Sequence, residues 1–104
     1  MTRDEYVAAT NSANQSYIAR AGSDLENAHA VDDAGLIRII EAQKRANIEQ
    51  FAEYQRSWVD RWVASNTTGD RRTNETVYLT LAAENARLEL QMRLEALHRE
   101  YTGS

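Results

Sequence analysis

The stretch AGLIRIIEAQKRANIEQFAEYQRSWVDRWV, residues 34–63, carries the apolar periodicity on which the predicted fold depends. Its positions recur at alternating intervals of three and four, which indicates one face of a helix with a heptad-like period. Three polar residues, Glu41, Lys44 and Gln55, interrupt this face. The apolar members of the face are Ala34, Ile37, Ile48, Phe51, Trp58 and Trp62, widened by Ile40, Ala52, Val59 and Val63.

The composition fits one small all-α domain. The chain has 104 residues, no proline and many strong helix formers. A net charge of −4 argues against a nucleic-acid partner, and the absence of cysteine excludes disulfides and thiolate chemistry. The N-terminus does not resemble a signal peptide, and no apolar run could span a bilayer. We therefore expect a cytoplasmic protein with no membrane partner.

Two capping boxes mark the expected starts of the first two helices. Residues 2–5, Thr-Arg-Asp-Glu, predict a first helix over 3–20 that Gly22 ends as a C′ residue. Ser23 to Glu26 form a second box, which predicts a helix over 24–65. Within it we expect a bend or break near 31–35, since Asp32 or Asp33 could cap a new start there and Gly35 weakens a helix.

The last helix is expected over 74–101, after a loop at 66–70, Asn-Thr-Thr-Gly-Asp. At 100° per residue it has apolar stripes on nearly opposite sides, which is typical of a helix between two partners. One stripe comprises Leu79, Ala83, Ala86, Leu90, Leu94, Leu97 and Tyr101, and the other Val77, Leu81, Leu88 and Met92.

The predicted architecture is a long helical hairpin with an N-terminal helix against part of it. Folding the last helix back antiparallel places Trp62 opposite Leu79 and Trp58 opposite Ala83. The second stripe is then unpartnered, so we expect copies to pair into an intermolecular four-helix or larger bundle. The expected interface residues are Val77, Leu81, Leu88, Met92, Trp58 and Trp62.

The sequence contains no convincing catalytic group and implies no cofactor. Glu41 and Lys44 could be a buried catalytic pair, but such pairs are more often structural ion pairs. Arg71 and Arg72 could receive an anion, although a solvated loop pair is the simpler interpretation. We therefore expect a non-enzymatic, homo-oligomeric helical protein that acts in assembly or in binding another protein, as a structural subunit, adaptor or protein inhibitor.

A metal-binding bundle is the alternative. Glu26–His29 and Glu95–His98 are both Glu-x-x-His pairs, which place two ligands on one helix face as in ferritin-like carboxylate proteins. One hairpin would keep the pairs apart, so such a site would have to form between subunits. Simpler roles exist for both pairs, since Glu26 belongs to a capping box and His98 lies near a helix C-terminus.

Overall fold

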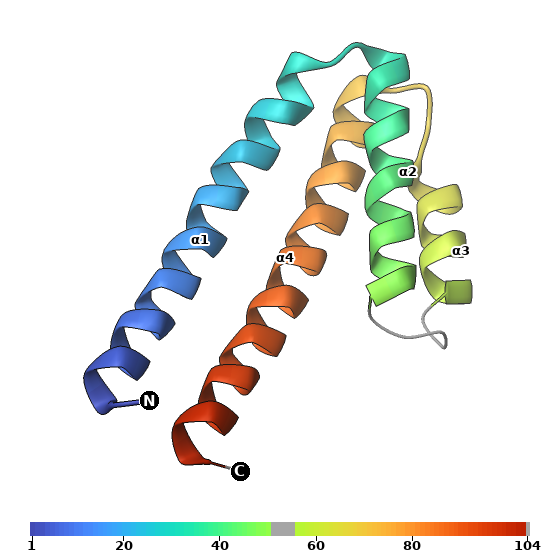
Figure 1. Cartoon of the computed structure of the whole chain (residues 1–104). Coiled ribbons are helices and arrows are strands. Elements are labelled where there is room, and N and C mark those ends of the chain that lie inside the picture. The colour runs from blue at the N-terminus through green and yellow to red at the C-terminus, as the bar shows by residue number, and fades with distance from the viewer. Residues whose placement is uncertain (51–55, 104) are drawn as a thin grey trace.

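The chain is all-helical over residues 1–50 and 56–103, which the computed structural model describes (Figure 1). This part contains α1 (Arg3–Ala30), α2 (Asp33–Gln50), α3 (Arg56–Asn66) and α4 (Arg71–Thr102). Helix α1 runs antiparallel to α4 along its length, while α2 and α3 lie beside the first half of α4 (Figure 1). The expected all-α class is therefore confirmed.

Helix α1 begins at the predicted capping box but does not end at Gly22. The Thr2 hydroxyl accepts from the Glu5 N–H, and the Glu5 carboxylate accepts from the Thr2 N–H, both at 3.1 Å. The predicted break between 20 and 24 is wrong, because α1 continues to Ala30. A single exposed glycine costs a helix only about 1 kcal/mol relative to alanine, and the packing of α1 on α4 offsets that cost.

The interruption before α2 falls inside the predicted interval 31–35. Val31 is extended, with φ −99° and ψ 154°, and the Asp32 carboxylate accepts a hydrogen bond from the Gly35 N–H at 2.7 Å. Gly35 is buried, and a Cβ there would lie 2.9 Å from Asp32 Oδ1. Glycine at this position thus allows the cap to close tightly against the start of α2.

The single helix predicted over residues 34–65 is wrong. Helices α2 and α3 lie side by side and antiparallel (Figure 1), and Lys44 Nζ is 3.5 Å from Asp60 Oδ1. In one straight helix, residues sixteen apart would be separated by about 24 Å. The predicted positions of Phe51 and Gln55 lie outside the described residues. Helix α2 also runs parallel to α4, so the predicted antiparallel pairing does not hold for it (Figure 1).

Helix α4 starts one turn before the predicted residue 74 because Asp70 caps it. The Asp70 carboxylate accepts from the Thr73 N–H at 2.9 Å and from its hydroxyl at 2.7 Å. Asn74 is buried and holds the preceding loop, since its amide accepts from the Thr68 N–H and donates to the Thr68 carbonyl. At the other end Gly103, at φ 74°, adopts the left-handed conformation that ends helices.

The core lies where all four helices meet. Val77 and Leu81 are only 3% exposed, so the expectation that they form an exposed stripe is wrong; α2 and α3 provide the cover within the chain. Leu88 is half-buried and Met92 is exposed, in the second half of α4. The main core cluster comprises Ala28, Leu36, Ile40, Val59, Val63, Val77, Tyr78, Leu81 and Ala82.

The molecule is long and thin. Its Cα extents are 52 × 30 × 14 Å, and its radius of gyration of 16.2 Å exceeds the roughly 13 Å of a compact domain of this length. Beyond α2 and α3 the described chain continues as α1 and α4 alone (Figure 1). At the end of this pair, Tyr6 and Tyr101 stack with ring centroids 4.5 Å apart. Half of the molecule is therefore a two-helix layer.

Candidate functional site

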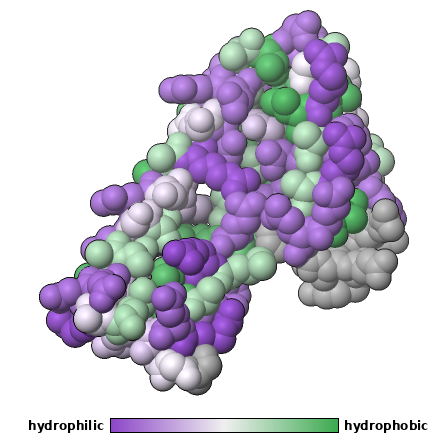
Figure 2. Space-filling model, viewed as in Figure 1, coloured by the Kyte–Doolittle hydropathy of each residue, from purple (hydrophilic) through white to green (hydrophobic). Residues whose placement is uncertain are grey.

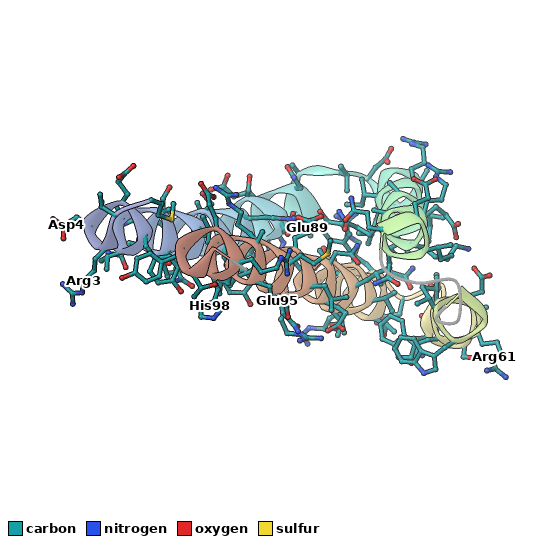
Figure 3. All side chains as sticks on the ribbon, turned by 60° about the horizontal axis from the view of Figure 1, so that its bottom comes forward. Arg3, Asp4, Arg61, Glu89, Glu95 and His98 are labelled. Carbon is teal, nitrogen blue, oxygen red and sulfur yellow. The ribbon has the colours of Figure 1, made fainter. Side chains whose placement is uncertain are left out.

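The four candidate metal ligands lie at opposite ends of the molecule. His29 Nδ1 is 3.9 Å from a Glu75 carboxylate oxygen, with 62% of its side chain exposed. His98 is exposed and points away from α1 (Figure 3). Glu75 and His98 are 23 residues apart along α4, which corresponds to about 35 Å. Glu26 and Glu95 are exposed as well, and within residues 1–50 and 56–103 no three His, Cys, Asp or Glu side chains are grouped to hold a metal ion.

The two tryptophans of α3 stack on each other, and only Trp62 also packs against the core. Their ring centroids are 6.3 Å apart with the planes 16° from parallel. Trp58 is 55% exposed and Ala83 is also exposed, so the pair does not form the closed layer predicted from the hairpin register. Trp62 is half-buried and lines a shallow cleft between α3 and α4. Trp58 is thus one of the large apolar side chains that the chain leaves in contact with solvent.

Lys44 forms a structural ion-pair cluster between α2 and α3. Its ammonium lies 2.9 Å from Glu41 and 3.5 Å from Asp60, and the hydrogen bond with Glu41 raises the pKa of Lys44. A lysine held charged by two carboxylates cannot act as a general base or nucleophile near neutral pH. The cluster therefore links the two helices rather than forming a catalytic pair.

Arg71 is a bridge between three helices, not the solvated loop residue expected beside Arg72. Its guanidinium donates to the carbonyls of Ala28 and Val31 at the end of α1, at 2.9 and 2.5 Å. It also contacts Asp33 of α2 at 3.0 Å and Glu75 of α4 at 2.8 Å. The free carbonyls at a helix C-terminus attract cations, but no local pattern indicates that this arginine reaches those of α1.

A buried amide cluster joins α2 to α4, and periodicity alone missed it. Asn47 and Asn85 are 2% and 0% exposed. Asn47 donates to the Asn85 side-chain oxygen at 2.8 Å, and Asn85 donates to the backbone and side-chain oxygens of Gln43 at 3.0 and 2.9 Å. Asn85 therefore fixes the register between α2 and α4, because a shift would leave buried amides unpaired.

A groove of about 430 Å³ runs between α1 and the second half of α4. Arg20 and Glu89 form an ion pair across it, and the labelled Glu89 lies toward α1 in Figure 3. Small residues keep the helices from filling this space. The groove is lined by Ala9, Ser12, Ala13, Ser16, Tyr17, Arg20, Ala86, Glu89, Leu90 and Arg93.

Large apolar side chains are exposed on each of the four helices. On the face in Figure 2, hydrophobic residues appear among hydrophilic ones along both halves of the molecule. Three of them, Val7, Ile18 and Leu25, lie on α1. The exposed large apolar residues are Met1, Val7, Ile18, Leu25, Ile37, Trp58, Met92 and Tyr101.

Comparison with known proteins gives no relative. No family model matches the chain, and neither a curated protein nor a solved structure matches it significantly. In the described part of the chain, no helix combines the length and apolar character needed to cross a membrane. The basis for a functional proposal is therefore the shape and surface described above.

Proposed function

We propose that this chain is a non-enzymatic helical protein that associates with copies of itself, as a structural subunit or as an adaptor that presents a paired surface to another protein. The observation that carries the proposal is the open half of the fold, in which α1 and α4 have only each other among the described residues. A pair of helices cannot enclose a core, and helices of this kind are normally completed by further helices.

The amount of exposed surface supports association. The chain has an accessible surface of 6,796 Å², whereas a compact monomer of its 11.8 kDa mass would have about 5,900 Å². The excess of about 900 Å² is close to the roughly 800 Å² that each partner buries in a standard protein interface. A self-associated form would therefore bring the surface per chain near that of an ordinary globular domain.

The distribution of charge is also compatible with self-association. Residues 3–20 and 88–103, the open half, carry four arginines and five carboxylates, a net charge of −1 out of the −4 of the whole chain. Both signs are interspersed, so two such halves can approach without strong repulsion. Met92, 53% exposed on α4, and Tyr101, 38% exposed at its end, provide apolar contact area there.

Thermal unfolding at different protein concentrations tests this proposal. Because association stabilises only the folded state, the midpoint of a self-associating protein rises with concentration. We expect the midpoint to rise by several degrees between about 1 and 100 µM. Association at the higher concentration adds roughly one to two kcal/mol to the free energy of unfolding, and each kcal/mol raises the midpoint of a domain of this size by about 4–8 °C. A midpoint that is the same at both concentrations would contradict the proposal.

A further inference from the structure

The outward side of α1 has the spacing of a helix-pairing seam. Val7, Ile18 and Leu25 are 43%, 69% and 47% exposed and fall on one line along the helix. Residues on this line recur at intervals of four, three, four, three and four, which is the spacing of a two-stranded coiled coil. We call this line the outer seam of α1; its members are Val7, Asn11, Asn14, Ile18, Ala21 and Leu25, and all are exposed.

The helix around this seam carries no charge for almost four turns. Residues 6–19 contain no Asp, Glu, Lys or Arg, although most of their side chains are exposed. The surface of a small domain is usually about 25–35% charged. An uncharged exposed segment in an acidic chain offers a place where two identical molecules can meet without repulsion between like charges.

The seam is placed to meet a further helix. The side of α1 that packs on α4 includes Tyr6, Ala13 and Asp24, and it lies roughly 110° around the helix from the outer seam at 100° per residue. A helix in a four-helix bundle meets its two neighbours at about a right angle. Among the described helices only α4 packs along α1 (Figure 1), so that second neighbour is absent from the described part of the chain.

The order of residues along the seam indicates a second copy of the same helix as the partner. In a parallel, in-register pair, Val7, Ile18 and Leu25 meet their own counterparts, and Asn14 meets Asn14. An antiparallel pair centred on residue 16 would instead place Asn14 against Ile18, which leaves an amide against an apolar side chain. Asn11, which falls at an a position of this spacing, also meets its own counterpart in the parallel pair, and a paired asparagine at an a position specifies register and favours two strands.

We propose that two copies of this chain pair through the outer seams of their α1 helices, parallel and in register, about a two-fold axis. This inference rests on the proposed self-association and adds the surface, the partner and its direction. Each chain exposes about 900 Å² more surface than a compact monomer of its mass would. A standard interface buries roughly 800 Å² per partner, so this excess is enough for such a dimer when the flanking surface of α4 also contributes.

Single-cysteine variants test the direction of pairing, because the natural chain has no cysteine. We expect Ile18→Cys to form a disulfide-linked dimer under mild oxidation, since the two positions face each other across the axis. Ala19→Cys, the next residue and also exposed, is the matched control and should remain unlinked. A mixture of Val7→Cys and Leu25→Cys that links to each other, while Ile18→Cys does not, would overturn the parallel arrangement.

Sedimentation of charge variants tests the surface itself. We expect Ile18→Glu to raise the dimer dissociation constant by at least about tenfold, with Ala19→Glu close to wild type and the helical circular dichroism of both unchanged. If the wild type associates but Ile18→Glu associates equally well, the seam is wrong and self-association stands. If the wild type stays monomeric, both proposals fail. Binding of a monomeric wild type, but not Ile18→Glu, to phosphatidylglycerol-containing vesicles would assign the seam to a membrane and overturn the dimer.

Discussion

Single polar side chains on α4 decide which helix packs on which side of it. Arg71 reaches the last carbonyls of α1, Tyr78 lies 3.4 Å from Asp24 of α1, and Asn85 bonds to α2. Each contact joins residues far apart in sequence, which is why local patterns could not reveal them. Arg71 looks like a solvated loop residue in the sequence, and its role depends on where the end of α1 lies.

The buried hydroxyl of Tyr78 makes stability depend on pH in the alkaline range. Burial raises the pKa of Tyr78, and the nearby Asp24 carboxylate acts in the same direction. The folded protein therefore keeps this proton at pH values where the unfolded chain has released it, so the stabilising contribution is complete below about pH 10 and is lost as pH rises toward the folded pKa. Lys44, whose pKa is also raised, adds a loss of the same sign.

We expect Tyr78→Phe to lose less stability than the wild type between about pH 9 and pH 11, because it has no phenol to ionise. Urea unfolding at several pH values would measure this, with Lys44 contributing equally to both proteins. Tyr101→Phe, which removes the hydroxyl of an exposed residue, is the matched control and should follow the wild type. Identical alkaline losses in the wild type and Tyr78→Phe would show that Tyr78 is not protected in the folded state.

Helical periodicity predicted the faces of the elements better than their partners. The two stripes of α4 correctly indicated a helix with neighbours on two sides. These neighbours belong to the same chain, since α1 packs along α4 while α2 and α3 cover Val77 and Leu81. The stripe pattern of residues 34–63 stays in phase throughout, so it contains no sign that α2 and α3 lie side by side. An apolar helix face indicates that another element covers it, but only the tertiary fold determines which element that is.

Two glycines test the helix boundaries, because they occupy opposite environments. At Gly22, inside α1, a Cβ would have no neighbouring atom within 4 Å, whereas a Cβ at Gly35 would lie 2.9 Å from Asp32 Oδ1 and 3.0 Å from Val31 Cβ. We expect Gly22→Ala to stabilise the protein by roughly 0.5–1 kcal/mol. Gly35→Ala should destabilise it by roughly 1–3 kcal/mol, as in other overpacked sites.

Equilibrium urea unfolding of both variants would measure these changes, and each serves as the control for the other. A loss of stability in Gly22→Ala would mean that the residue ends a helix in a left-handed conformation, as the sequence alone suggested. A gain in Gly35→Ala would mean that the cap between Asp32 and α2 is loose enough to admit a side chain.

At the scale of the whole molecule, the shape is the main reason to expect a partner. The sequence predicted an elongated chain from one overlong helix, and the structure is elongated for another reason: α1 and α4 extend past α2 and α3 (Figure 1). The interface that we propose therefore differs from the one expected from the sequence, because Val77 and Leu81 are buried within the chain while Val7, Ile18 and Leu25 are exposed on α1. Periodicity did not identify these three residues as an interface, because it could not show which side of α1 packs on α4.

The absolute molar mass in solution tests the central claim, that the chain associates with itself. Light scattering coupled to size exclusion, at protein concentrations from about 1 to 100 µM, would give this mass without assuming a shape. We expect at least twice the 11.8 kDa of the chain at the upper concentrations, with dissociation on dilution. A mass of 11.8 kDa at every concentration would contradict self-association.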